Sequence, residues 1–300
     1  MVKVTAELIS GTEISKQIKS ELKEEVAAFA AKHGYAPHIT VILVGDNPAS
    51  ASYVGMKEKT AVKLGMGSET IRLPAETTEE ELLDLIVKLN NDPKVHGILV
   101  QLPLPKQIDE KKVIETINPS KDVDGFHPIN VGRMLVGEKD VLLPCTPHGI
   151  QVMLMRSGVE TSGANVVIVG RSNIVGKPMA AILVQKAPGA NATVTICHTR
   201  TKDMGAVTRG ADILIVAAGV AEFVRGDMIK PGAVVIDVGS NRVEDPSLEK
   251  GYKWVGDVAF DEAMEVASKI TPVPGGVGPM TIAMLMTNTL QAARNQAGDE

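Results

Sequence analysis

Short apolar segments alternate with helical segments twice along the chain, and this alternation restricts the fold more than any other feature. In the first half, His38–Val44 and His96–Leu102 are apolar, β-branched runs typical of buried strands. Amphipathic helices are expected over Thr12–Lys32 and Ala49–Leu64, and a third begins after the capping hydroxyl of Thr77. Such alternation predicts a parallel sheet covered by helices.

The alternation restarts in the second half in a pattern typical of dinucleotide-binding proteins. Its expected strands are Val166–Val169, Thr193–Cys197, Ile213–Ala217 and Val234–Val238. Helices fill the first gaps between them, as in a doubly wound, Rossmann-type parallel sheet. After a Pro- and Gly-rich loop, one long apolar helix runs to about Gln296. We expect this C-terminal helix to return to the first domain.

We therefore predict an α/β protein with two α/β domains. A chain of 300 residues exceeds the size that a single hydrophobic core usually reaches. The first domain is predicted over residues 1–147, completed by the C-terminal helix at 279–300, and the Rossmann-type domain over 148–278. Residues Pro103–Pro147 are rich in Pro and Gly and are expected to form loops and short helices at the edge of a site.

Composition excludes several classes of function. A net charge of −5 and an aromatic content of 3% argue against a nucleic-acid partner, which needs basic and stacking surfaces. Uninterrupted apolar runs of about 18 residues, needed to span a membrane, are missing from the sequence. The segment Met1–Glu7 is charged where a signal peptide would be apolar. Cys145 and Cys197 match no metal spacing and fit buried, reduced thiols, so we expect a cytoplasmic protein without a metal.

The loop after the first strand of the second half is the candidate cofactor site. It reads Gly170-Arg171-Ser172-Asn173-Ile174-Val175-Gly176-Lys177-Pro178. A strand that ends in glycine and turns into a helix presents backbone N–H groups to a pyrophosphate. Only two glycines of the usual three are recognisable, so an ordinary strand–helix turn is the alternative. The strand ladder behind the loop favours a dinucleotide, with contacts expected from Gly170, Arg171, Ser172, Ile174 and Val175.

The end of the next strand favours NADP over NAD. An NAD site usually has a carboxylate there, but this strand runs into His198-Thr199-Arg200-Thr201. Thr199, Arg200 and Arg171 suit a ribose 2′-phosphate, unless Arg200 simply points to solvent. Gly239 closes a later strand and is expected to permit close approach to the ribose or nicotinamide.

Four polar residues in the first half are candidates for chemistry. Tyr53 and Lys57 lie four residues apart and therefore share one face of their helix. Gln101 ends a buried strand, at the edge of the sheet where α/β sites form. Asp124 lies in the acidic turn Lys121–Phe126. Singly these signals are weak, because a Tyr/Lys pair is usually a solvated face and an Asp-Gly pair is usually only a turn.

Together, these residues resemble the bifunctional methylenetetrahydrofolate dehydrogenase/methenyltetrahydrofolate cyclohydrolase family. The similarity covers nearly the whole chain and rests on Tyr53–Lys57, Val100–Pro105, Lys121–Gly125, Pro144–Pro147, Gly170–Ser172 and Pro274–Thr281. Thr199 stands where many relatives have serine, and either residue offers a hydroxyl. The resemblance implies a folate substrate, NADP and a homodimer.

The resemblance also implies a role for each candidate. Asp124 would hold the pterin, whose paired N–H donors match the two carboxylate oxygens. Tyr53 would stack on the folate. Lys57 would be the acid/base group that hydrolyses the methenyl bridge, for which it must be a neutral amine part of the time. Gln101 would orient Lys57 without adding a charge that keeps it an ammonium.

The loop before the C-terminal helix is the last part of the predicted site. Pro274, Gly275, Gly276 and Val277 would line the folate and the nicotinamide, although a tight turn before the helix explains the same residues. Other two-domain NADP oxidoreductases, such as a dehydrogenase without cyclohydrolase activity or one of the shikimate type, are the alternatives among enzymes. A non-catalytic NADP-binding regulator is a further alternative. The presence of both Lys57 and Gln101 favours the bifunctional enzyme.

Overall fold

The computed structural model describes residues 5–299 and divides into two compact units. Unit 1 comprises Met1–Lys16 and Thr146–Thr281, and unit 2 comprises Gln17–Cys145 and Ile282–Glu300. Residues 1–4, which carry part of the argument against a signal peptide, lie outside the described residues. Two α/β units of this kind confirm the predicted fold class.

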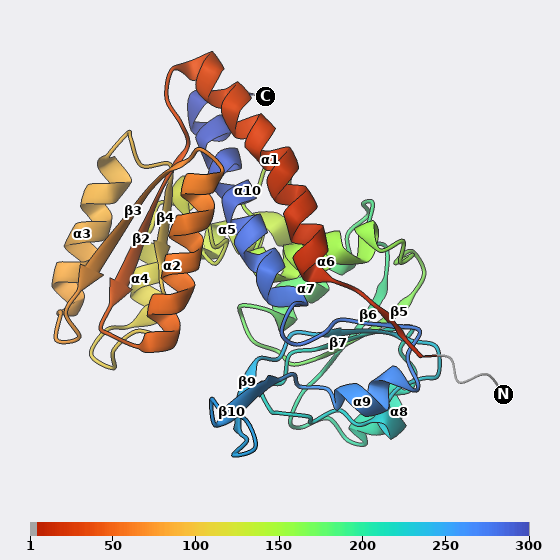
Figure 1. Ribbon diagram of the computed structural model, residues 1–300. Coiled ribbons are helices and arrows are strands. Elements are labelled where there is room, and N and C mark those ends of the chain that lie inside the picture. The colour runs from red at the N-terminus through yellow and green to blue at the C-terminus, as the bar shows by residue number, and fades with distance from the viewer. Residues whose placement is uncertain (1–4, 300) are drawn as a thin grey trace. The chain divides into compact units, whose positions relative to one another are not determined.

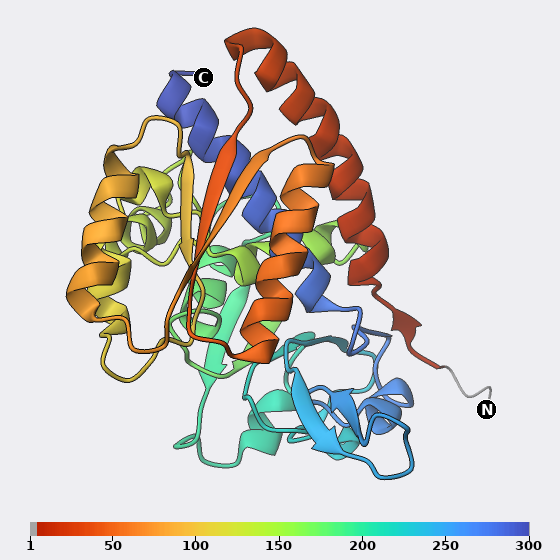
Figure 2. The same cartoon turned by 60° about the vertical axis from the view of Figure 1, so that its left-hand side comes forward.

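Unit 2 is built on a parallel sheet with the strand order β3-β2-β4. Its strands are β2 (His38–Val44), β3 (Gly67–Leu73) and β4 (Gly97–Val100). Strand β2 pairs with β3 over its full length and with β4 from Ile39 to Ile42. Helix α2 (Pro48–Lys63) covers one face, and α3 (Glu79–Asn91) and α4 (Glu110–Thr116) cover the other (Figures 1 and 2).

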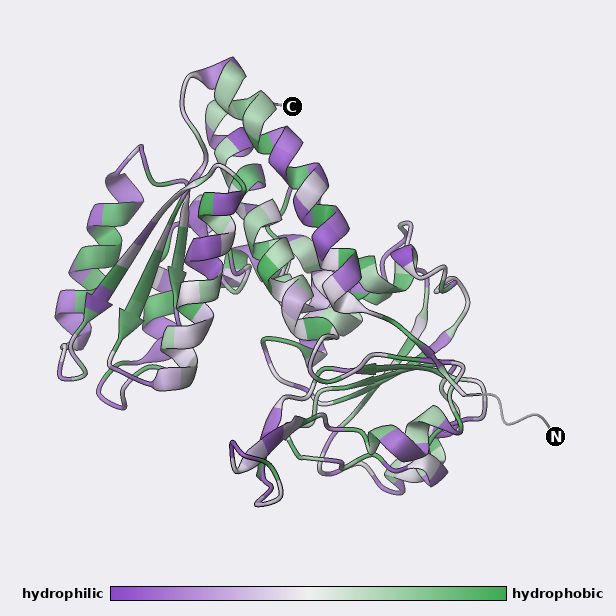
Figure 3. Ribbon diagram, viewed as in Figure 1, coloured by the Kyte–Doolittle hydropathy of each residue, from purple (hydrophilic) through white to green (hydrophobic). Residues whose placement is uncertain are grey.

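The core of unit 2 explains why this sheet forms. Ile42, Val44, Ile98 and Val100 are buried against apolar side chains of α3 and α4. Helix α3 starts with a capping box, in which Thr78 and Glu81 satisfy each other's backbone N–H groups. Figure 3 shows β2 and β4 as mostly hydrophobic ribbon, as expected for strands covered on both faces, whereas the edge strand β3 is mixed.

Most of the C-terminal helix belongs to unit 2. Helix α10 (Val277–Ala297) starts in unit 1, but its residues from Ile282 onward belong to unit 2. Its Asn288 and Gln296 side chains donate hydrogen bonds to the backbone carbonyls of Val123 and His96, respectively. The remaining helical segments are α1 (Gly11–His33), η1 (Pro119–Lys121) and α5 (Pro128–Leu135).

Unit 1 contains a second parallel sheet with the strand order β1-β11-β8-β7-β5-β6. The strands are β1 (Glu7–Leu8), β5 (Asn165–Val169), β6 (Thr193–Cys197), β7 (Ile213–Val216), β8 (Val234–Asp237) and β11 (Lys269–Ile270). The chain leaves β5 toward β6 on one side and returns to β7 on the other, so the strand order reverses at β5. Ligands of doubly wound sheets bind at such a reversal, beyond the carboxyl ends of the strands.

Helices cover both faces of the unit 1 sheet. Figure 1 shows α6 (Cys145–Arg156) and α7 (Gly176–Leu183) above the strands, and α8 (Met204–Thr208) and α9 (Phe260–Met264) below them. The lower core contains Val169, Leu214 and Val235. None of the helices among residues 5–299 is long and apolar enough to cross a membrane.

Several short elements of unit 1 were not predicted. They are η2 (Gly226–Met228) and the antiparallel hairpin of β9 (Asn241–Glu244) and β10 (Tyr252–Val255), together with β1, α8, α9 and β11. Strand β1 pairs with β11 in unit 1, whereas the sequence prediction assigned all of residues 1–147 to the first domain. A strand of two residues carries no periodicity from which its sheet could be inferred.

Candidate active site

A buried lysine and an uncharged amide meet at the carboxyl edge of the unit 2 sheet. The Lys57 side chain is only 8% exposed, and its Nζ donates a hydrogen bond to Oε1 of Gln101 at 2.8 Å. Gln101 follows β4, and its backbone N–H donates to the Ile42 carbonyl. Its Nε2 donates to the Leu102 carbonyl, also at 2.8 Å, which orients the amide so that its oxygen faces Lys57.

An acidic side chain lies close to this pair. Asp124 is half-buried, and burial raises the pKa of its carboxyl to about 6, which the Lys57 charge opposes and the Asp122 charge reinforces. Asp124 therefore lies within electrostatic reach of Lys57. The structure brings together three of the four predicted catalytic residues.

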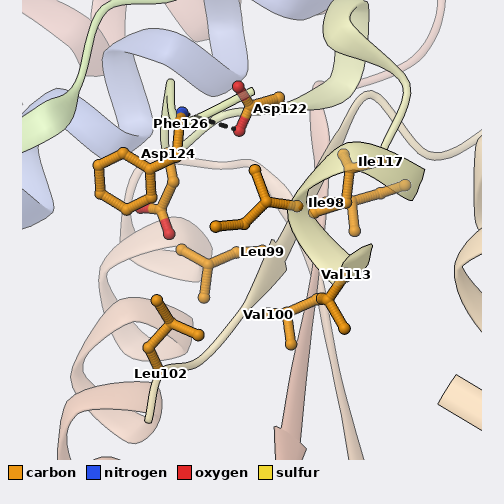
Figure 4. A pocket seen from close by; sticks show the side chains of 10 residues that line it. Ile98, Leu99, Val100, Leu102, Val113, Ile117, Asp122, Asp124 and Phe126 are labelled. Atoms are coloured by element: carbon orange, nitrogen blue, oxygen red, sulfur yellow. Dashed lines mark hydrogen bonds between the residues drawn. The ribbon is translucent and has the colours of Figure 1, made fainter. Parts of the chain in front are cut away.

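Asp124 faces a largely apolar pocket in unit 2. We call it the Asp124 pocket, and its lining residues are Ile98, Leu99, Val100, Leu102, Val113, Ile114, Ile117, Asp122, Asp124 and Phe126. Figure 4 shows the Asp124 carboxylate beside the Phe126 ring, with Leu99 and Leu102 next to it. The pocket has a volume of only about 20 Å³, so it admits little more than a water molecule and a larger ligand would meet Asp124 from outside it.

Asp122 fixes the loop that carries Asp124. Its carboxylate accepts hydrogen bonds from the backbone N–H groups of Phe126 at 3.3 Å and His127 at 2.8 Å. The Asn130 side chain donates a third at 2.9 Å. Burial raises the pKa of Asp122, and these hydrogen bonds oppose the shift. The sequence indicated an acidic turn but did not reveal that Asp122 holds the loop while Asp124 faces the pocket.

Tyr53 lies one helical turn before Lys57 on α2. Its side chain is 41% exposed, so a ring face is accessible to a ligand. Both residues lie on α2, where a spacing of four residues puts them on the same face of the helix. The stacking role of Tyr53 remains a prediction.

In unit 1, the end of β5 forms a close backbone approach that suits a dinucleotide. Gly170 has a φ of 127°, and a Cβ there would overlap the carbonyl oxygen of Ala217 after β7. Its N–H donates to the Cys197 carbonyl at the end of β6 at 2.9 Å. The loops after β5 and β6 are therefore adjacent, and they carry the exposed Arg171 and Arg200. Two cations on neighbouring loops fit the charge of a ribose 2′-phosphate.

The sequence predicted free backbone N–H groups where β5 turns into α7, but in the structure several of these groups are already hydrogen-bonded within the loop. The Ser172 side-chain oxygen accepts hydrogen bonds from the N–H groups of Val175 and Gly176, and its carbonyl accepts one from Lys177. A pyrophosphate would therefore be held by earlier residues of the loop. Ile174 is exposed and Val175 is buried, while Thr199 is exposed in the turn after β6.

Gly239 is required by the protein's own packing. A Cβ at this position would overlap the backbone nitrogen and carboxylate of Asp257. We expected this glycine to allow a ligand to approach, and that role remains a prediction. Thr199, Arg200 and Gly239 follow strands whose carboxyl ends lie at the same edge of the sheet as Gly170.

Asp257 is a residue at this edge that sequence reasoning missed. It is fully buried, and its carboxylate accepts hydrogen bonds from the Gly219 N–H at 2.7 Å and the Asn241 side chain at 2.8 Å. Its own N–H donates to Asp237, whose carboxylate also binds the N–H groups of Gly239 and Val258. Burial raises the pKa of Asp237 to about 6 despite these hydrogen bonds. Asp257 lies in an irregular segment, where no periodicity marks it.

The loop before α10 is anchored within unit 1. The Gly275 carbonyl accepts hydrogen bonds from the backbone and the hydroxyl of Thr12. The buried Thr271 hydroxyl accepts from the Asp237 N–H at 2.8 Å, which ties the loop to the end of β8. Pro274 and Gly276 lie between these anchors and Val277, the first residue of α10. Whether this loop contacts substrate remains a prediction.

The fold and these two sets of residues define a class of protein. Unit 1 has the strand reversal, glycine approach and paired cations of a dinucleotide-binding fold, and unit 2 has a lysine, an amide and a carboxylate suited to acid–base chemistry. This combination is typical of a two-domain, nucleotide-dependent oxidoreductase that also performs proton transfer.

The chain belongs to the tetrahydrofolate dehydrogenase/cyclohydrolase family. Residues 9–124 match the catalytic domain of that family, and residues 144–297 match its NAD(P)-binding domain. It is 62% identical to the bifunctional protein FolD of Syntrophobacter fumaroxidans over 291 residues, which cover 97% of this chain and 98% of the relative.

Solved structures of the family have the same fold. The bifunctional FolD enzyme of Campylobacter jejuni is 50% identical with a TM-score of 0.89, and the match covers 96% of this chain and 98% of that one. The Trypanosoma brucei enzyme, solved with NADP and an inhibitor, is 41% identical with a TM-score of 0.92, covering 98% and 99% of the two chains. These matches extend over both units.

Proposed function

We infer that this protein catalyses two successive steps of one-carbon folate chemistry. It oxidises 5,10-methylenetetrahydrofolate with NADP and then hydrolyses the 5,10-methenyl product to 10-formyltetrahydrofolate. The observation that carries this proposal is the Lys57–Gln101 hydrogen bond of 2.8 Å, formed within electrostatic reach of Asp124. It places an acid/base group next to a carboxylate that can bind the pterin.

Asp124 holds the folate ring in this proposal. The pterin presents an amino group and a ring N–H as a paired donor edge, and an ionised carboxylate supplies two matching acceptors. The accessible ring of Tyr53 stacks on the folate, which leaves Lys57 near the carbon that bridges N5 and N10.

Lys57 moves the protons of hydrolysis. As a neutral amine it takes a proton from the water that attacks the methenyl carbon and returns that proton to N5 as the bond between the carbon and N5 breaks. The hydroxyl left on the carbon loses its own proton to solvent as the formyl C=O forms. The formyl group then remains on N10. Gln101 accepts a hydrogen bond from Lys57 and orients it. Because the amide is uncharged, it does not stabilise the ammonium form as a carboxylate would.

The residues of unit 1 fit NADP. The loops after β5 and β6 meet at Gly170, and the exposed Arg171, Arg200 and Thr199 on them suit a 2′-phosphate. The bound nicotinamide supplies the hydride acceptor of the oxidation. The protein's task in that step is to bind and orient both ligands, because the two nitrogens that flank the methylene carbon stabilise the cation that develops. The loop from Pro274 to Val277 lines the reacting groups in this proposal.

We also propose that the protein is a cytoplasmic homodimer. Cys145 and Cys197 are both free and buried, as in proteins of reducing compartments. Trp254 is 41% exposed on the β9–β10 hairpin, and exposed aromatic surface is commonly buried by subunit association. Light scattering after size-exclusion chromatography should give twice the mass of the chain. A mass of one chain at micromolar concentration contradicts the dimer.

A spectrophotometric assay tests the proposed function. Purified protein is mixed with methylenetetrahydrofolate and either NADP or NAD, and the absorbances of reduced cofactor and methenyl product are followed. We expect reduction of NADP in preference to NAD, and separate decay of added methenyltetrahydrofolate. Binding of NADP without turnover of either folate indicates a regulator instead, and no signal with either cofactor contradicts the proposal.

A further inference from the structure

A side chain of the C-terminal helix hydrogen-bonds the peptide group that precedes Asp124. Asn288 of α10 is 4% exposed, and its Nδ2 donates hydrogen bonds to the carbonyls of Val123 and Leu143, both at 2.8 Å. The two hydrogens of one amide therefore join two chain segments that lie 20 residues apart. Val123 is 165 residues away from Asn288 in sequence, so these contacts form only in the folded protein.

A second donor reinforces the contact with Val123. The Cys145 thiol donates to the same carbonyl at 3.3 Å, and Asn288 Nδ2 lies 3.6 Å from its sulfur. Burial and the neighbouring Asp124 charge raise the pKa of the Cys145 thiol well above its ordinary value. The thiol is therefore protonated and available as a donor.

The Val123 carbonyl determines the direction of the next residue. It belongs to the rigid, planar peptide unit that contains the Asp124 nitrogen, so a fixed carbonyl fixes how the chain enters Asp124. On the other side of Asp124, Gly125 has a φ of 73°, and a Cβ there would overlap the backbone of Leu143 and Pro144. The Leu143 carbonyl is the second group that Asn288 holds.

We propose that Asn288 is a positioning residue for the folate site, which aims the Asp124 carboxylate by holding the Val123 carbonyl before it and the Leu143 backbone, against which Gly125 packs. This inference rests on the proposed function, because Asp124 must bind the pterin for its direction to matter. A displacement of about 1 Å in a binding group can change rates by up to roughly 100-fold. Asn288 thus influences the site without contacting substrate.

The test compares Asn288→Leu with Thr289→Val. Leucine keeps the branched shape of asparagine but has no donor. Thr289 is its neighbour on the same helix, is fully buried, and its hydroxyl donates to the Leu285 carbonyl of that helix at 2.8 Å. We expect Asn288→Leu to raise the KM for methylenetetrahydrofolate about 10-fold. The KM for NADP should stay unchanged, and Thr289→Val should alter neither.

A double-mutant cycle separates positioning from general stabilisation. In an Asp124→Asn background, Asn288→Leu should have little further effect on the folate KM, because the group that it aims has already lost its charge. If Asn288→Leu fails to fold, Asn288→Ser, which retains one donor, replaces it in the same cycle. A lowered melting temperature with an unchanged folate KM, or equal effects in both backgrounds, overturns the proposal. Wild-type protein without folate turnover instead refutes the proposed function itself.

Discussion

At Gln101 an uncharged amide occupies the place beside Lys57 where a carboxylate would be the usual partner of a buried lysine. The amide oxygen accepts the lysine hydrogen bond at 2.8 Å, and the amide nitrogen is held by the Leu102 carbonyl. This arrangement orients Lys57 but leaves its charge uncompensated by the closest partner. The acidic group within electrostatic reach of Lys57 is Asp124.

We predict that Gln101→Glu reduces hydrolysis more than Gln101→Met. Glutamate keeps the size and the acceptor but adds a charge that stabilises the Lys57 ammonium, whereas methionine only removes the acceptor. The glutamate variant should lose about 100-fold or more of cyclohydrolase kcat and shift its optimum to more alkaline pH. Steady-state rates from neutral to alkaline pH measure this. Wild-type hydrolysis in Gln101→Glu would contradict the role of the amide.

We predict a pH dependence of folate binding from Asp124. Burial raises the pKa of its carboxyl to about 6, and only the ionised form can accept both donors of the pterin edge. The kcat/KM for the folate should therefore be constant above this pKa and fall as pH drops below it. An Asp124→Asn variant serves as the control for titration of the substrate. The residual kcat/KM of this variant should not show the same fall at low pH. An identical fall in both proteins would assign the pH dependence to another group.

The pairing of Lys57 with Gln101 was expected only from the resemblance to the family, and the support of Asp124 was not expected at all. The helix spacing and the end of a buried strand marked Lys57 and Gln101 singly and weakly. Asn288 and Asp257 act through hydrogen bonds to distant backbone groups. A buried polar residue within an apolar helix, such as Asn288, is a signal that some partner exists, but the sequence does not identify it.

Among the elements, the turn from β5 into α7 depends most on one residue. Gly170 combines a φ of 127° with a close approach to the Ala217 carbonyl, and both exclude a side chain. We predict that Gly170→Ala raises the KM for NADP and lowers the stability by more than about 1 kcal/mol. The KM for the folate should change much less. Cofactor titration and urea unfolding measure the two effects.

For a glycine within a helix we predict the opposite effect on stability. Gly132 of α5 has helical backbone geometry, and a Cβ there meets nothing within 4 Å. Gly132→Ala should therefore raise the free energy of unfolding by about 0.5–1 kcal/mol, because it restricts the unfolded chain without a clash. If Gly132→Ala and Gly170→Ala lowered the free energy of unfolding equally, the backbone geometry at each position would not explain the effect of these substitutions.

Long and buried elements were easier to predict from the sequence than short and exposed ones. The strands β2, β7 and β8 were predicted within about one residue because continuous apolar runs mark strands covered on both faces. In the β9–β10 hairpin polar and apolar residues are mixed and none of the strand residues is fully buried, so it lacks that signal. Helices α8 and α9 have five residues each, too few to show a helical period.

At the scale of the whole molecule, two α/β units with different tasks account for the two proposed activities. Unit 1 carries the features that suit a dinucleotide, and unit 2 carries Lys57, Gln101 and Asp124. Hydride transfer requires both ligands, whereas hydrolysis requires only the folate and an acid/base group. The account therefore predicts that the two activities can be separated by a change confined to unit 2.

Replacement of Lys57 by methionine tests this claim most directly. Methionine has nearly the length of lysine but cannot transfer a proton, and Lys59→Met, at an exposed position on the same helix, is the matched control. Both reactions are measured on each purified variant with the same folate preparation. We predict that Lys57→Met reduces methenyltetrahydrofolate hydrolysis to the uncatalysed rate while NADP-dependent oxidation remains measurable, and that Lys59→Met retains both activities. Full hydrolysis by Lys57→Met, or equal loss of both reactions, would contradict the account.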